Sequence, residues 1–271
     1  MYSIYHFFAE LIRERARLTE DMTLEALPNL KASPLFSCRN IGAFPDRAIR
    51  LQPQPALYTG GELIEFKDSK SYSISSFNST IPTGKKLVSA LKPNVKQKMA
   101  ASGDDLLLLP LRDVFYLVRG RDKIHTKVCL LHGSFFETIP VEQLIQAAFA
   151  QILEEGIGAQ LSQIEKDHLA ALFKTQNMFN RVRTIPNASV KPRFRIMTEA
   201  TAEGNILNTA RYPEIKPDSL NLVLPFYSSG EQERHIELTQ IALEHKFGQV
   251  TIEQIKHPLN GWFIVFRCLF N

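Results

Sequence analysis

Apolar residues recur at helical spacing in several parts of the chain. Near the N-terminus, Ile4, Phe7, Phe8, Leu11 and Ile12 share one face of a helix that we expect over residues 4–18. The same spacing after Pro140 predicts a helix over residues 140–155. Further helices are expected over residues 23–30, 160–174 and 235–247. The chain is therefore expected to carry an amphipathic helix before any strand.

Strand patterns alternate with these helices. A short strand over residues 62–68 follows Gly60 and Gly61, and two β-rich runs over residues 113–121 and 123–132 are joined by a hairpin turn. Later strands are predicted over residues 193–198, 220–226, 249–256 and 262–269. The order predicts a mixed α/β fold, with a core over residues 1–186 and a β-rich C-terminal part over residues 187–271 that packs on it.

Composition narrows the class of protein. The chain has 271 residues, of which 44% are hydrophobic and 22% charged, as in ordinary globular proteins. No apolar run reaches the roughly 18–20 residues that cross a bilayer, and the first residues lack the features of a signal peptide. Cys38, Cys129 and Cys268 show no zinc-ligand spacing. We therefore expect a cytoplasmic protein with reduced thiols and no membrane partner.

Positive charge is concentrated in two stretches, although the net charge is only +4. Residues 66–98 contain seven lysines and a single acid, and residues 181–195 contain five basic residues and no acid. Such stretches are typical of surfaces that bind a polyanion, and equally of a solvated lysine-rich surface when either is taken alone.

The strand over residues 62–68 carries the candidate chemistry. Glu65 and Lys67 are two apart, so their side chains share one face, about 6.6 Å apart along the chain. A carboxylate that holds Mg²⁺, beside a lysine that orients water or stabilises negative charge, suits phosphodiester hydrolysis. The same spacing also occurs as a solvated pair on ordinary strands, so the context of the pair decides its meaning.

That context resembles a known nuclease signature. Pro45-Asp46 followed by Glu65-Phe66-Lys67 is similar to the motif of the PD-(D/E)xK superfamily. Residues 62–87 (ELIEFKDSKSYSISSFNSTIPTGKKL) also resemble type II restriction endonucleases of the NgoPII family, in which a strand of this kind precedes a serine-rich stretch, Asn-Ser-Ser/Thr, a proline and lysines. The resemblance is specific over about 30 residues and does not extend to the last 80.

The resemblance implies a restriction-endonuclease-like fold and a Mg²⁺-dependent enzyme that cuts both strands of a short palindromic DNA site. It further implies a homodimer, and a cognate DNA methyltransferase that forms no stable complex with it. Asp46, Glu65 and the peptide carbonyl of Phe66 would hold the metal, with Lys67 as the catalytic lysine. Asp46 lies further upstream than the family pattern places it, and Asp68 or Glu10 would be next in line as the second acid.

The expected DNA contacts lie in the two basic stretches. Small polar groups can meet base edges or phosphates, and arginine forks suit both. The first group is Lys70, Ser76, Asn78, Ser79, Thr80, Lys85 and Lys86, and the second is Arg181, Arg183, Lys191, Arg193 and Arg195. For the first group, a turn-rich loop that satisfies its own backbone is the alternative.

Two other functions remain open at this point. A repair or junction-resolving nuclease would use the same catalytic core, and a non-catalytic DNA-binding protein would keep the fold without the metal. The seven histidines show no spacing typical of a metal site or of a nucleophile and its base, so each is interpreted as structural.

Overall fold

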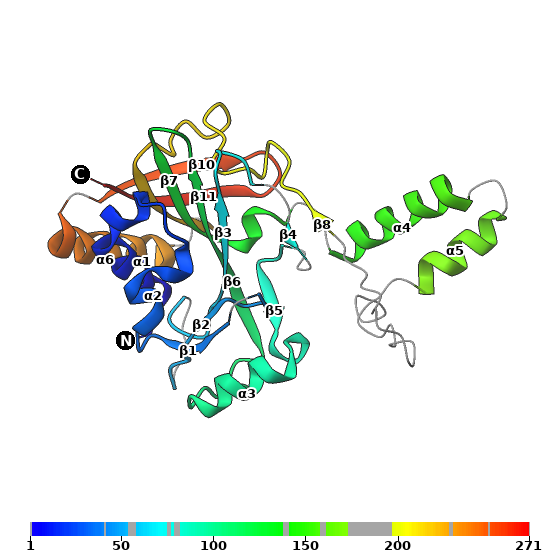
Figure 1. Ribbon diagram of the computed structural model, residues 1–271, viewed down its shortest axis with the longest axis horizontal. Coiled ribbons are helices and arrows are strands. Elements are labelled where there is room, and N and C mark those ends of the chain that lie inside the picture. Colours follow the sequence, from blue (N-terminus) through cyan, green and yellow to red (C-terminus); the bar gives the residue numbers. More distant parts are fainter. Residues whose placement is uncertain are drawn as a thin grey trace. The chain divides into compact units, whose positions relative to one another are not determined.

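The computed structural model describes residues 2–40, 42–53, 58–74, 77–78, 82–137, 141–157, 161–172, 197–227, 230–248 and 250–270 (Figure 1). The chain divides into two compact units. The first comprises Met1–Ser76, Pro82–Phe136 and Glu199–Asn271, and the second comprises Phe77–Ile81 and Glu137–Thr198. The candidate residues of the PD-(D/E)xK motif all belong to the first unit.

The elements of the first unit are helices and strands in alternation. The helical elements are α1 (Ile4–Arg13), η1 (Arg15–Thr19), η2 (Leu24–Ala26), α2 (Pro28–Ala32), η3 (Val88–Ala90), α3 (Pro93–Ala101), η4 (Gly133–Phe135) and α6 (Gly230–Phe247). The strands are β1 (Phe36–Arg39), β2 (Arg47–Ile49), β3 (Leu63–Ser69), β5 (Lys85–Leu87), β6 (Leu111–Arg121), β7 (Thr126–His132), β9 (Ser219–Pro225), β10 (Thr251–His257) and β11 (Gly261–Leu269).

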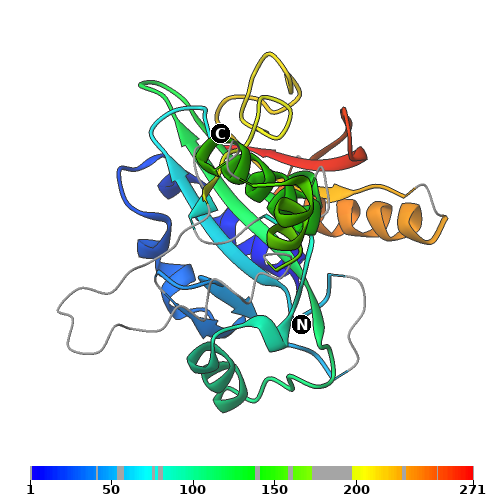
Figure 2. The ribbon, with the colours of Figure 1, turned by 90° about the vertical axis from the view of Figure 1, so that its right-hand side faces the viewer.

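The strands of the first unit form one mixed sheet in the order β1-β2-β3-β6-β7-β9-β11-β10, with β5 paired to β6. Two pairs are parallel, β3 with β6 and β7 with β9, and the other pairs are antiparallel. Figure 2 shows β3 and β6 running side by side in cyan and green. The prediction of a mixed α/β fold, with a large sheet flanked by helices, is confirmed.

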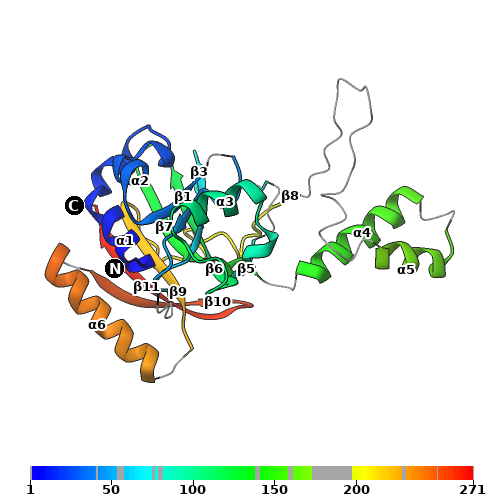
Figure 3. The same ribbon diagram turned by 90° about the horizontal axis from the view of Figure 1, so that it is seen from below.

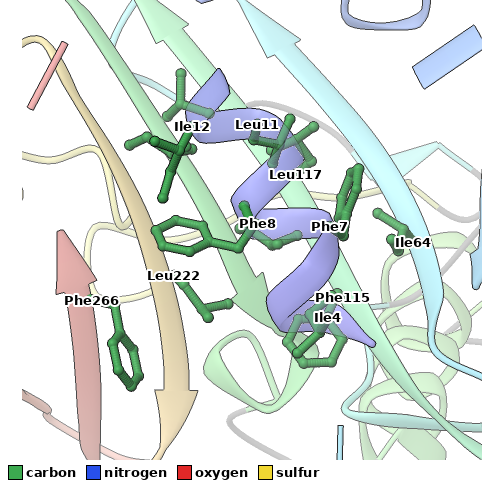
Figure 4. Packing of buried hydrophobic residues seen from close by; sticks show 14 of the residues in the cluster. Ile4, Phe7, Phe8, Leu11, Ile12, Ile64, Phe115, Leu117, Leu222 and Phe266 are labelled. Atoms are coloured by element: carbon green, nitrogen blue, oxygen red, sulfur yellow. The ribbon is translucent and has the colours of Figure 1, made fainter. Parts of the chain in front are cut away.

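Helix α1 closes one face of the sheet. Ser3 caps it by accepting the N–H of His6 at 3.1 Å, and Phe7 and Phe8 are fully buried. Figure 4 shows the apolar side of the helix packed against residues of β3, β6, β9 and β11. Burying one such phenylalanine stabilises the fold by about 1.5–3 kcal/mol. Helix α6, orange in Figure 3, adds Ile236 and Leu243 to the same apolar cluster.

The other face of the sheet is buried as well. Along β6, Phe115 and Leu117 belong to the cluster beneath α1, whereas Tyr116 and Val118 are also buried and point the opposite way. A strand buried on both faces is apolar without alternation, which is the pattern of residues 114–118. Charged groups such as Glu65 must therefore reach the surface near strand ends or sit in the interior with partners.

Three features of the fold differ from the sequence-based expectations or refine them. The helix expected over residues 4–18 ends at Arg13 and continues as the 3₁₀ turn η1. Helix α3 was not predicted, because its apolar spacing is weak and only Val95 and Met99 are buried. The strands of residues 187–271 were expected to pack on the core; instead β9, β11 and β10 extend the sheet of the core, since β9 pairs with β7.

The second unit contains a helical pair and a short strand pair. Helices α4 (Val141–Ile157) and α5 (Gln163–Leu172) contact each other, and β4 (Phe77–Asn78) pairs with β8 (Met197–Thr198). Helices were predicted here over residues 140–155 and 160–174, and both are present.

Cys38, Cys129 and Cys268 are free and buried. No helix in the described ranges has the length and apolar character that a bilayer-spanning segment needs.

Candidate active site

The antiparallel pairing of β2 with β3 places Asp46 beside the Glu-x-Lys strand. Arg47 pairs with Ile64, so Asp46, one residue earlier, comes level with Glu65. The carboxylate of Asp46 is fixed there because its Oδ2 accepts the N–H of Phe66 at 2.8 Å. Asp46 directly precedes β2, and the long connection from β2 to β3 follows that strand. The length of this connection therefore does not separate Asp46 from Glu65.

Glu65 and Lys67 form an ion pair on the face that was predicted for them. Lys67 Nζ lies 3.1 Å from Glu65 Oε1, and the two side chains are 19% and 12% exposed. The second carboxylate oxygen, Glu65 Oε2, is buried and has no hydrogen-bond partner among the described residues. A buried carboxylate oxygen without a donor is unfavourable, so this atom is suited to a cation or to a bound water.

Electrostatics also connects the two acids. Burial and the negative charge of Glu65 raise the pKa of Asp46 to about 7, while the N–H of Phe66 and the charge of Lys67 act in the opposite direction. A carboxyl group with a raised pKa beside a second carboxylate is typical of sites that bind a metal or move a proton. A divalent cation between the two would remove their repulsion.

The donors present fit a magnesium ion. Because the N–H and C=O of one strand residue point to the same side, the carbonyl of Phe66 faces the side on which Asp46 accepts its N–H. Two carboxylates and a peptide carbonyl, completed by water and phosphate oxygens, are the hard oxygen ligands that Mg²⁺ takes. Within the described residues, no group of three or more His, Cys, Asp or Glu side chains is arranged to hold a metal, so the set depends on this carbonyl.

The two alternative acids have other partners. Glu10 accepts the hydroxyl of Ser33 at 2.9 Å. Asp68 accepts a hydrogen bond from Nε of the buried Arg119 at 3.0 Å. Alternation along β3 also directs Asp68 away from the face of Glu65 and Lys67. Asp46 is therefore the acid that the fold brings to Glu65.

The lysines expected to contact DNA are distributed over different places. Lys70 lines a hollow of about 360 Å³ together with Arg121 and Lys123. Lys85 is exposed, and its Nζ lies 3.9 Å from Asp113 Oδ1. Lys86 is half-buried, and its Nζ lies 4.8 Å from the centre of the Phe44 ring.

The other expected DNA contacts are outside the described part of the chain. Asn78 pairs through its backbone with Met197, and its side chain is not described. The residues outside the described ranges are Ser76, Ser79, Thr80, Arg181, Arg183, Lys191, Arg193 and Arg195. Their assignment to DNA contacts stays a prediction.

The sequence analysis did not predict a series of hydrogen bonds that links Ser134, His132 and Asp113. His132 Nδ1 lies 2.7 Å from the hydroxyl of Ser134, and His132 Nε2 lies 3.2 Å from Asp113 Oδ1. The same Nδ1 accepts the backbone N–H of Ser134, and it caps η4. His132 is 3% exposed and so caps this turn from the interior. The sequence feature that could have indicated these hydrogen bonds is the His-x-Ser spacing at the end of a predicted strand.

Comparisons with known proteins add no relative. No family model matches the chain, and the searches of curated proteins and of solved structures found no match either. The geometry of the site and the sequence resemblance therefore carry the functional argument.

Changing Asp46 to asparagine should weaken metal binding and change the pH dependence of stability. The pKa of Asp46 rises from 3.8 to about 7 on folding, so the folded state binds more protons than the unfolded state between these values. The free energy of unfolding of the metal-free wild type should therefore fall as the pH rises from about 4 to 7. Asp46→Asn lacks this contribution, and its stability relative to wild type should rise over that window.

Two measurements check the effect of Asp46→Asn. Calorimetric titration with Mg²⁺ should show affinity reduced by at least about tenfold, and urea unfolding at several pH values should show the widening difference in stability. Asp21→Asn is the matched control, because that carboxylate is 95% exposed and lies against Arg121. Unchanged Mg²⁺ affinity in Asp46→Asn would remove Asp46 from the metal site.

Proposed function

We propose that this protein is a Mg²⁺-dependent deoxyribonuclease of the type II restriction endonuclease kind. The observation that carries the proposal is the hydrogen bond from the Phe66 N–H to Asp46, which holds a second carboxylate level with Glu65 and Lys67. Two acids and a lysine in this arrangement suit the hydrolysis of a phosphodiester. The mixed sheet flanked by helices agrees with the restriction-endonuclease-like core that the sequence resemblance implies.

Each residue has a distinct role in the proposed reaction. Asp46, Glu65 and the carbonyl of Phe66 would hold Mg²⁺, which supplies a polarised phosphate and a water of lowered pKa. Lys67 is positioned by Glu65 at 3.1 Å, and its ammonium group orients the attacking water or stabilises the negative charge that develops on the phosphate. Both functions rely on the position that the ion pair with Glu65 gives to the amine.

The finer parts of the proposal rest on the resemblance. A type II enzyme reads a short palindromic site as a homodimer, since two-fold symmetry of the protein matches that of the DNA. It acts in the cytoplasm, beside a methyltransferase that protects the host DNA without forming a stable complex. The lysine-rich and arginine-rich stretches would supply phosphate and base contacts.

Digestion of a sequenced plasmid in Mg²⁺ tests the proposal. Discrete fragments with mapped ends of one sequence are the expected result. Cleavage without sequence preference, or at branched substrates alone, would instead identify a repair or junction-resolving nuclease. DNA binding that is independent of metal and leaves the plasmid intact would identify a non-catalytic binding protein.

A further inference from the structure

The register of the sheet places Lys86 on the same face as Glu65. On β5, Lys86 pairs with Arg112 of β6, and directly paired residues of antiparallel strands share a face. Along β6 that face continues from Arg112 to Tyr116, and Tyr116 is level with Glu65 on the parallel strand β3. Lys86 and Glu65 therefore project from the same side of the sheet.

Lys86 also faces the segment that leads into Asp46. Lys86 Nζ lies 4.8 Å from the centre of the Phe44 ring, and Phe44 precedes Pro45 and Asp46 in the chain. Burial lowers the pKa of Lys86, and the negative charge of Glu65 acts in the opposite direction. Lys86 therefore interacts electrostatically with Glu65, although the two are 21 positions apart in the sequence.

No carboxylate in the described part of the chain forms an ion pair or hydrogen bond with Lys86. The neighbouring Lys85 differs, because it points to the opposite face and lies 3.9 Å from Asp113. A half-buried ammonium group that only faces an aromatic ring loses hydration without gaining an anionic partner. Such a group is suited to bind an anion that arrives with the substrate.

We infer that Lys86 is a second active-site lysine, which contacts the phosphate that is cleaved and stabilises its negative charge in the transition state. The inference rests on the proposed nuclease function and adds to it a residue from a different strand. Lys67 comes from the metal-binding strand itself, whereas Lys86 approaches from β5. A phosphate bound to a metal ion between Asp46 and Glu65 would then have ammonium groups from two strands within its surroundings.

Replacing Lys86 by methionine should slow the chemical step and leave DNA affinity nearly intact. With saturating plasmid-derived DNA and Mg²⁺, we expect the single-turnover cleavage rate of Lys86→Met to fall about a hundredfold. Its dissociation constant for the same DNA in Ca²⁺ should change less than about threefold, since one phosphate contact among many is lost. Lys256→Met is the matched control, because Lys256 Nζ also faces an aromatic ring, 5.6 Å from the centre of Trp262, but on the edge strand β10. This variant should cut at nearly the wild-type rate.

Titration with Ca²⁺ alone gives a readout that does not depend on cleavage. Removing a positive charge that acts on Glu65 should tighten Ca²⁺ binding by about two- to fivefold in Lys86→Met and leave it unchanged in Lys256→Met. Should Lys86→Met fail to fold in circular dichroism, Lys86→Arg and Lys86→Gln decide instead. The inference then requires the arginine variant to cut at least about tenfold faster than the glutamine variant.

The outcomes separate the two proposals. A folded Lys86→Met protein that cuts like the wild type overturns the role of Lys86 and leaves the nuclease standing. Equal effects of the Lys256 and Lys86 variants on cleavage also overturn it, because they indicate a general contribution of charge. A wild-type protein that cuts no DNA contradicts the nuclease itself, and unchanged Ca²⁺ affinity in Lys86→Met then contradicts the placement of Lys86 at the site too.

Discussion

Replacing Glu65 by glutamine is expected to lower the rate of DNA cleavage by roughly a thousandfold or more, and Lys67→Ala should do the same. Glu65 contacts Lys67, the proposed catalytic lysine, and its second carboxylate oxygen is buried with no hydrogen-bond partner among the described residues. The amide of glutamine keeps the size of the side chain but supplies neither the charge for Mg²⁺ nor a strong acceptor for Lys67. Single-turnover cleavage of plasmid DNA measures the effect, with DNA binding in Ca²⁺ as the reference for affinity.

Glu62→Gln is the matched control for Glu65→Gln. Glu62 directly precedes the same strand, but alternation turns it to the face of Ile64, where its Oε1 accepts the N–H of Gly60 at 3.0 Å. Burial raises the pKa of Glu62 to about 7, so the amide should relieve the cost of an ionised carboxylate at alkaline pH. We expect cleavage to survive in Glu62→Gln, and similar losses in both variants would contradict the assignment of Glu65.

Asp104→Ala should destabilise the fold by about 3–5 kcal/mol. Asp104 and Arg112 form a two-pronged ion pair at 2.9 and 3.0 Å in which both side chains are fully buried. Asp104 also accepts the hydroxyl of Ser37 at 2.7 Å and thereby connects the end of α3 to β1. Loss of the carboxylate leaves the guanidinium charged and buried without its partner. Urea unfolding at neutral pH measures the loss.

The double variant Asp104→Leu, Arg112→Met separates the cost of an unpaired buried charge from the loss of the other contacts that Asp104 and Arg112 make. Replacing both charges by apolar groups of similar size should recover most of the stability lost in Asp104→Ala, because the uncompensated charge is gone. A double variant as unstable as the single one would show that the remaining contacts of these residues, such as the hydrogen bond to Ser37, carry the stability. Arg267→Met at the partly exposed pair with Glu253 serves as a control and should cost about 1 kcal/mol or less.

Local patterning was sufficient for the elements that depend on neighbouring residues. The helix at α1 followed from the spacing of Ile4, Phe7 and Phe8, because a face that is apolar every three to four residues must be buried. The strand β3 followed from the glycine pair and the alternating residues after it. The pairing of Glu65 with Lys67 was also foreseen, since alternation in a strand is fixed by backbone geometry.

Contacts between distant segments required the tertiary structure. Sequence spacing made the distance from Asp46 to Glu65 look long, whereas the antiparallel return of β2 makes them neighbours. The same holds for Lys86, which reaches the face of Glu65 through β5 and β6, and for β9, which joins the sheet beside β7. The repeat of a helix or strand determines which way a side chain points. Which strands pair with one another depends instead on the apolar surface that the whole core buries. For this reason the sequence alone predicted the shared face of Glu65 and Lys67, whereas only the fold showed that Asp46 lies level with Glu65 and that Lys86 projects from the same face.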